Sequence, residues 1–103
     1  MHILAKFIVL YHEPKDKDRF DKHYNEVHIP LVEKMPHVKS TSLNKIVDTQ
    51  NNDLKYYQIV EIEYESLEDL NESLSSDAGR KVSEDAPNLA PFLHRPPVIF
   101  ITA

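Results

Sequence analysis

Apolar stretches of two kinds alternate along the chain, and their spacing predicts both strands and helices. Residues 3–11 (ILAKFIVLY) are apolar at odd and even positions, which is typical of a strand buried on both faces. Residues 55–64 (KYYQIVEIEY), rich in tyrosine, isoleucine and valine, predict a second central strand. The more polar residues 38–48 predict an edge strand joined to it by a hairpin, and residues 98–102 predict a last strand.

Helical spacing appears in the two segments that separate these strands. We expect a helix from about residue 16 to 28, with Asp16 as its N-cap. On a straight helix Ile29 would face away from the apolar side, and Pro30 interrupts the hydrogen-bond ladder. The helix is therefore expected to break or bend between His28 and Leu31 and to continue as a short turn over residues 30–35. Residues 66–69 (SLED) form a capping box that starts a second helix.

The resulting order, β-α-β-β-α-β, predicts an α+β protein of ferredoxin-like fold with a four-stranded antiparallel sheet, in one domain over residues 1–103. Both helices of such a fold cover one face of the sheet. In the first strand we assign the uncharged odd positions to that face: Ile3, Ala5, Phe7, Val9 and Tyr11. Lys6, Glu61 and Glu63 then share the other face, where Ile8 and Leu10 also need a cover. A second copy of the chain is the simplest cover, so we expect a homodimer.

Composition excludes several classes of function. The net charge of −5, with acids and bases interleaved, gives no footprint for nucleic acid or an anionic membrane. The single glycine excludes a dinucleotide fingerprint and a P-loop, and the lack of cysteine excludes thiolate catalysis and cysteine-based metal sites. The chain has neither an apolar run of membrane-spanning length nor a secretory signal pattern, so a cytoplasmic location is expected.

One motif in the first helix resembles the signature of the EthD family. It consists of Phe20, His23, Tyr24, His28, Pro30, Leu31, Met35 and Pro36. Residues 85–92 also resemble the family, whereas His37 departs from it, since glycine usually follows Met-Pro there. The resemblance implies a dimeric α/β barrel related to muconolactone-type isomerases and small antibiotic-biosynthesis monooxygenases.

His28 is the candidate catalytic residue. It lies at the edge of the buried side of the helix, one turn after Tyr24 and just before Pro30. An imidazole there can act as an acid–base group at neutral pH. The structural alternative, in which the ring bonds a free carbonyl and fills space beside the break, has equal weight.

Three further residues are candidates for substrate binding: Tyr24, Gln58 and His23. The Tyr24 hydroxyl and the Gln58 amide both need partners if buried, and either protein or substrate could supply them. His23 is about 140° from His28 on a regular helix, so we place it at the rim and expect no shared ligand. We predict no metal site, and we interpret Glu61 and Glu63 as structural partners of Lys6.

Two classes of function remain open. In the first, the chain is a cofactor-independent enzyme of isomerase, dehydratase or monooxygenase type that acts on a small apolar organic molecule, with His28 as acid–base. In the second, it is a non-catalytic dimeric barrel that binds a hydrophobic ligand or partner. Haem binding through His28 has no support beyond that one histidine.

Overall fold

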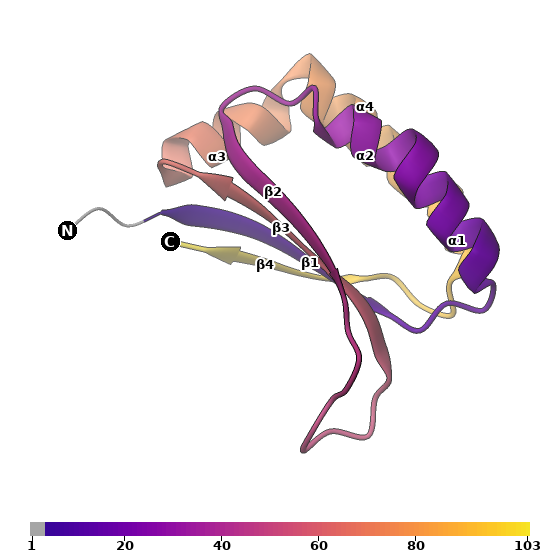
Figure 1. Ribbon diagram of the computed structural model, residues 1–103. Helices are drawn as coiled ribbons and strands as arrows, with labels where there is room; N and C mark the ends of the chain where they lie inside the picture. Colours follow the sequence, from indigo (N-terminus) through magenta and orange to yellow (C-terminus); the bar gives the residue numbers. More distant parts are fainter. Residues whose placement is uncertain (1–3) are drawn as a thin grey trace.

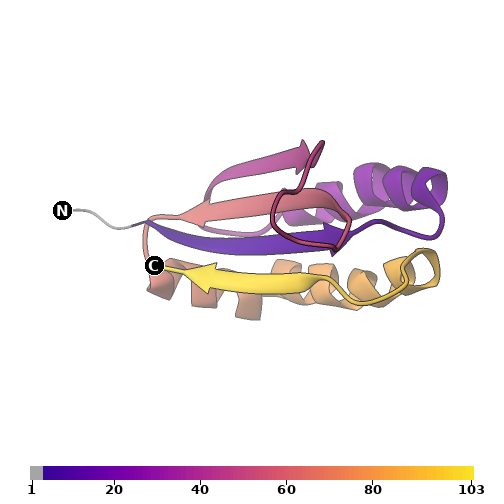
Figure 2. The same ribbon diagram turned by 90° about the horizontal axis from the view of Figure 1, so that it is seen from below.

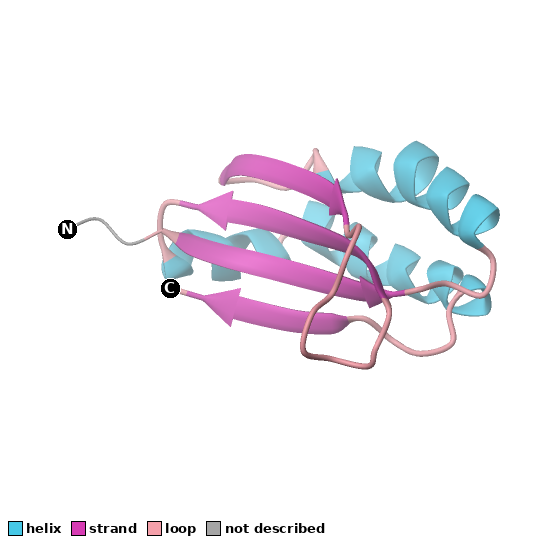
Figure 3. Cartoon of the chain, turned by 60° about the horizontal axis from the view of Figure 1, so that its bottom comes forward, coloured by secondary structure: helices cyan, strands magenta, loops and turns pink. Residues whose placement is uncertain are grey.

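One four-stranded antiparallel sheet and a helical layer make up the chain, as described by a computed structural model of residues 4–103. The strands, in the spatial order β2-β3-β1-β4 (Figure 3), are β1 Ala5–His12, β2 Val38–Lys45, β3 Tyr56–Tyr64 and β4 Val98–Thr102. The helical segments are α1 Lys17–His23, η1 Tyr24–His28, α2 Ile29–Val32, α3 Leu67–Ser75, α4 Asp77–Asp85 and η2 Ala86–Phe92. All helices cover one face of the sheet (Figure 1), so the predicted ferredoxin-like fold is confirmed.

The predicted faces of β1 are also confirmed. Ala5, Val9 and Tyr11 are buried under the helices, while Ile3 lies outside the described residues. On the opposite face Lys6 Nζ lies 3.6 Å from a carboxylate oxygen of Glu61, the predicted ion pair. The helix-free face and β4 expose apolar side chains. In β4 these are Val98, Ile99, Phe100 and Ile101.

The capping residues predicted from sequence have the expected contacts. Asp16 accepts a hydrogen bond from the N–H of Arg19 at 3.1 Å, and Ser66 accepts one from the N–H of Asp69 at 3.1 Å. The helices that start there run side by side behind the sheet (Figure 2). Among residues 4–103, no helix combines the length and the apolar character that crossing a membrane requires.

The predicted break before Pro30 is wrong. The helix continues from α1 through η1 into α2 without interruption, and η1 is a π-helical turn. The irregularity therefore takes the form of a wider turn that precedes the proline rather than a gap. This turn rotates Ile29 toward the core, where it packs against the buried cluster and no longer faces the wrong side.

Candidate functional site

The π-helical turn η1 decides how the two histidines of the first helix are placed. There the N–H of Ile29 donates to the carbonyl of Tyr24, five residues earlier, instead of the usual four. A turn of this width brings residues five apart onto one face. His23 and His28 consequently point the same way, contrary to the expectation from a regular helix. π-Helical turns are rare and occur frequently at functional sites.

Both histidines bind one buried carboxylate, that of Asp85 at the end of α4. Nδ1 of His28 lies 2.9 Å from Oδ2 of Asp85, and Nε2 of His23 lies 2.9 and 3.1 Å from Oδ1 and Oδ2. The side-chain amide of Asn88, in η2, donates to Oδ1 at 3.0 Å. His28 and Asp85 are each only 6% exposed. The cluster therefore joins the first helix to the junction between α4 and η2.

Hydrogen bonding keeps Asp85 ionised despite its burial. Burial opposes ionisation, but the donors from Asn88, His28 and His23 outweigh it and hold the pKa of Asp85 below its ordinary value. A carboxylate can only accept hydrogen bonds, so His28 must carry its proton on Nδ1 and His23 must carry one on Nε2. Nε2 of His28 remains as the ring nitrogen that is free to exchange a proton.

A row of aromatic rings continues from His28 along the first helix and β1. The ring of His28 lies 4.9 Å from that of Tyr24, whose ring stacks on Phe20 and meets Tyr11 edge-on at 5.5 Å. The ring of Tyr24 thus lies between those of His28 and Tyr11 in the interior. Burial raises the pKa of Tyr11 to about 12 and raises that of Tyr24 as well, so both hydroxyls stay protonated at neutral pH.

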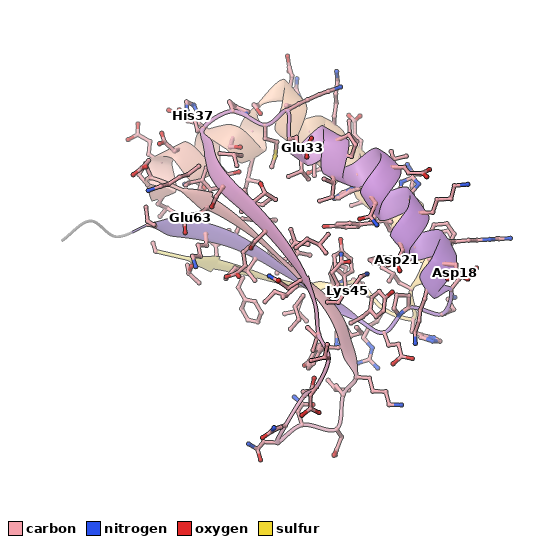
Figure 4. All side chains as sticks on the ribbon, viewed as in Figure 1. Asp18, Asp21, Glu33, His37, Lys45 and Glu63 are labelled. Carbon is pink, nitrogen blue, oxygen red and sulfur yellow. The ribbon has the colours of Figure 1, made fainter. Side chains whose placement is uncertain are left out.

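Gln58 belongs to a different polar cluster, between β2, β3 and α1. Lys45 donates to Oε1 of Gln58 at 2.8 Å and to Oδ1 of Asp21 at 2.6 Å, and Tyr57 donates to Oδ2 of Asp21 at 2.7 Å. Figure 4 shows Lys45 and Asp21 approaching each other from the sheet and the helix. Gln58 is 1% exposed, and its Nε2 is enclosed without a hydrogen-bond partner. Its position opposite Tyr11 in the strand register places this amide on the helix-facing side, as predicted.

The structure thus brings three of the four predicted site residues together, namely Tyr24, His28 and His23, and adds Asp85 to them. Sequence reasoning missed Asp85, because acidic residues are common and nothing in its spacing marks it as buried. The combination of two histidines five apart with a proline two residues later was the signal that could have indicated a π-helical turn.

Surface hollows lie near this cluster but not at His28. A hollow of about 230 Å³ beside the first helix is lined by His23 and Phe92, among others. Four surface hollows among residues 4–103, with volumes of about 230 to 470 Å³, do not have His28 in their lining. His23, predicted at the rim, therefore reaches both the buried carboxylate and the surface.

Three side chains elsewhere could ligate a metal ion: His37, Asp69 and Glu72, whose ligand atoms lie within 4.8 Å of one another. His37, labelled in Figure 4 at the start of β2, has φ 66°, the left-handed conformation that a glycine favours. Its Nε2 lies 3.1 Å from Glu72, as in a surface ion pair. Proximity alone is common among exposed charged groups, so we assign no metal here.

Comparison with known proteins adds family and fold. A family model described as the EthD domain matches residues 12–92. An uncharacterised 11.0 kDa protein of Rhodococcus erythropolis is 29% identical over 87 residues, which cover 84% of each chain. A crystal structure of an ethyl tert-butyl ether d (EthD) family protein from Bacillus halodurans is 30% identical, with a TM-score of 0.85 and 98% of each chain covered.

More distant structures share the fold only. A hydroxynitrile lyase from Passiflora edulis has a TM-score of 0.74 at 11% identity, covering 99% of this chain and 94% of its own. A dimeric ferredoxin-like protein of unknown function from Jannaschia has a TM-score of 0.69 at 10% identity, covering 98% of this chain and 99% of its own. The fold is therefore found both in an enzyme and in proteins without an assigned activity.

Proposed function

The chain belongs to the EthD family, and on this premise we propose that it is a cofactor-independent acid–base enzyme. The substrate is a small, largely apolar organic molecule. The reaction is a proton transfer that leads to isomerisation or dehydration, or to oxygenation with molecular oxygen as the oxidant, and His28 is the group that moves the proton. Acid–base groups alone suffice for the proton transfer itself, and no cofactor is invoked.

The observation that carries this proposal is the bond between His28 and Asp85. A buried carboxylate on one ring nitrogen fixes the tautomer and the orientation of an imidazole, and it stabilises the imidazolium that forms when the other nitrogen takes up a proton. Nδ1 of His28 has such a partner at 2.9 Å. Tyr24, in ring contact with His28, and Tyr11, in ring contact with Tyr24, have hydroxyls whose raised pKa keeps them protonated as further donors.

Substrate contacts follow from the neighbours of His28. Tyr24 is the nearest candidate to hold a polar substrate atom, and the unpartnered Nε2 of Gln58 is a second donor farther along the interior. His23 lines the hollow of about 230 Å³ that lies on the surface side of Asp85. We assign the substrate path to this hollow. Because His28 is buried, the path requires local opening of the helical layer.

Deuterium exchange tests the proposal without a known substrate. A panel of small ketones, lactones and aldehydes is incubated with the protein in D₂O, and NMR follows the loss of the C–H signal beside the carbonyl. We expect catalysed exchange of at least one compound, and a loss of about 10²–10⁴-fold in His28→Asn. The asparagine amide keeps a donor close to the position of Nδ1 but has no basic nitrogen.

The matched control is His37→Asn, which changes an exposed histidine at a left-handed position that asparagine tolerates. This variant should exchange at the wild-type rate. Wild-type protein that exchanges no compound of the panel, or His28→Asn protein that exchanges as fast as the wild type, would contradict the proposal.

The assembly proposed for this function is a homodimer. The helix-free face of the sheet and β4 expose apolar side chains that one protomer leaves uncovered. A self-complementary contact between two helix-free faces covers Val98 and Phe100, which lie on that face opposite Leu10 and Ile8, and closes the two sheets into a barrel. Structural relatives from Bacteroides fragilis and Jannaschia are themselves described as dimeric.

A second candidate function is favoured by the enclosure of His28. The residue is 6% exposed and does not line the four hollows described above, as expected for a histidine that only holds two helical segments together. The protein would then be a non-catalytic barrel that binds a hydrophobic ligand or partner. In that case His28→Asn has no activity to remove, and no compound of the panel exchanges.

A further inference from the structure

Four side chains that can carry positive charge meet at one end of the sheet, away from His28. They are His12, Lys55, His94 and Arg95, and they line a hollow of about 290 Å³ that follows the end of β1. The whole chain carries a net charge of −5, so such a gathering runs against its overall charge. We call this site the basic hollow.

The charges in the basic hollow are poorly compensated. Neither Lys55 nor Arg95 has a carboxylate within ion-pair distance among residues 4–103. The one acidic residue of the lining, Glu13, forms an ion pair with Lys17 at 3.1 Å and also interacts electrostatically with Lys55 and His94, so the lining keeps an excess of positive charge. The hollow therefore carries a positive potential that attracts an anion.

His12 gives an independent indication of a missing partner. Its Nδ1 is enclosed but has no hydrogen-bond partner, which is uncommon for a buried polar atom. Burial, together with the nearby charge of Arg95, lowers the pKa of His12. A bound anion would offset the unfavourable electrostatic interaction between His12 and Arg95. Its oxygen atoms would also offer a hydrogen-bond partner at the wall of the hollow.

An apolar hollow lies next to the basic one and shares His94 and Arg95 with it. Its volume is about 470 Å³. The rest of its lining is mainly apolar: Ala86, Pro87, Ala90, Leu93, Pro96 and Pro97. Because Arg95 borders both hollows, one ligand can place a charged group on one side of this residue and an apolar body on the other.

We propose that the two hollows together bind a small organic carboxylate with an apolar body. Arg95 and Lys55 bind the carboxylate, since a guanidinium matches its two oxygens in a bidentate pair. The apolar body packs on Leu93 and the neighbouring prolines. This site does not include His28 or Asp85, so it is separate from the proposed acid–base site.

Titration calorimetry with three probes tests this site on the wild-type protein. Benzoate should bind saturably, benzyl alcohol should not, and inorganic phosphate should bind at least about tenfold more weakly than benzoate because it lacks an apolar body. Benzyl alcohol that binds as tightly as benzoate would overturn the role of charge. Phosphate that equals benzoate would overturn the role of the apolar hollow.

Variants then locate the site. Arg95→Met and Lys55→Met remove exposed charges, so the fold should be retained, and each should weaken benzoate binding by about tenfold or more. Lys81→Met, an exposed lysine on α4 outside both hollows, is the matched control and should bind like the wild type. His28→Asn should also bind benzoate unchanged. Full benzoate affinity in both Arg95→Met and Lys55→Met would overturn the proposal.

Discussion

At the scale of single residues, Asp85 is the side chain on which the site depends. It accepts hydrogen bonds from two histidines and an asparagine while it is almost fully buried. The sequence predicted His28 and Tyr24, because helical spacing and the family motif mark them. The stretch 85–92 that resembles the family includes Asp85, but the sequence could not indicate its burial, which results from the packing of α4 and η2 against the first helix.

Replacing Asp85 by asparagine should lower the free energy of unfolding at pH 7 by about 1–3 kcal/mol, because at least one buried donor loses its acceptor. The pKa of Asp85 in the fold lies below its ordinary value of 3.8. Its ionised form therefore stabilises the fold above that pH, and this contribution is lost as the pH falls through the lower folded-state pKa.

The measurement is chemical denaturation of the wild type and of Asp85→Asn from pH 7 down to about pH 3. The difference between the two should shrink below the ordinary aspartate pKa. Glu84→Gln, an exposed carboxylate on the same helix, is the control and should stay close to the wild type at every pH. A difference for Asp85→Asn that grows toward low pH would contradict this account.

At the scale of elements, the first helix shows where sequence reasoning reaches its limit. The apolar spacing predicted its start, its N-cap and its buried side, and the misplaced Ile29 correctly indicated an irregularity. The apolar spacing alone does not decide between a break and a π-helical turn. The choice depends on tertiary contacts, because Asp85 binds both His23 and His28 only if they share a face.

Deletion of Asn25 tests whether η1 contains one residue more than a regular turn. This exposed residue lies within the π-helical turn. When it is deleted, the turn can become regular α-helix while the segments before and after it keep the same sides toward the core. Deletion of the exposed Asn71 in the regular helix α3 rotates the rest of that helix by about 100° and removes Leu74 from its packing. We expect thermal unfolding to show a much larger loss of stability for the second deletion. Equal losses would argue against an extra residue in η1.

Gly79 sets the close approach of α3 and α4. A Cβ atom at this position would lie 2.3 Å from the carbonyl oxygen of Ser73 and 2.5 Å from that of Leu74. Gly79→Ala should therefore lower stability by about 1–3 kcal/mol despite the higher helix propensity of alanine. Lys81→Ala on the same helix should change it by less than about 0.5 kcal/mol in denaturant titrations. A stabilised Gly79→Ala protein would show that the two helices separate easily.

At the scale of the whole molecule, the fold followed from the order of the elements, and the proposed assembly rests on their uncovered surface. The strand order, the edge position of β2 and the two faces of β1 all agree with the sequence pattern. These features depend on hydrophobic periodicity, which a sequence displays directly. The side-chain cluster around Asp85 depends on contacts between residues about 60 positions apart, which periodicity does not display.

Light scattering should give about twice the chain mass of 12.0 kDa at micromolar concentration. Ile8 lies on the helix-free face opposite Phe100 of β4, so Ile8→Asp should place a charge in the interface and yield monomers. Val27→Asp, at an exposed apolar position of the first helix, should remain dimeric. A monomeric wild-type protein would contradict the proposed assembly.

The central claim is that one carboxylate fixes both histidines and leaves Nε2 of His28 free to move a proton. Long-range ¹⁵N–¹H NMR of the imidazole rings, recorded at about pH 9 where unperturbed histidines are neutral, tests it most directly. The hydrogen bonds to Asp85 predict opposite tautomers, with the proton of His28 on Nδ1 and that of His23 on Nε2. A spectrum in which His28 carries its proton on Nε2 would contradict the account.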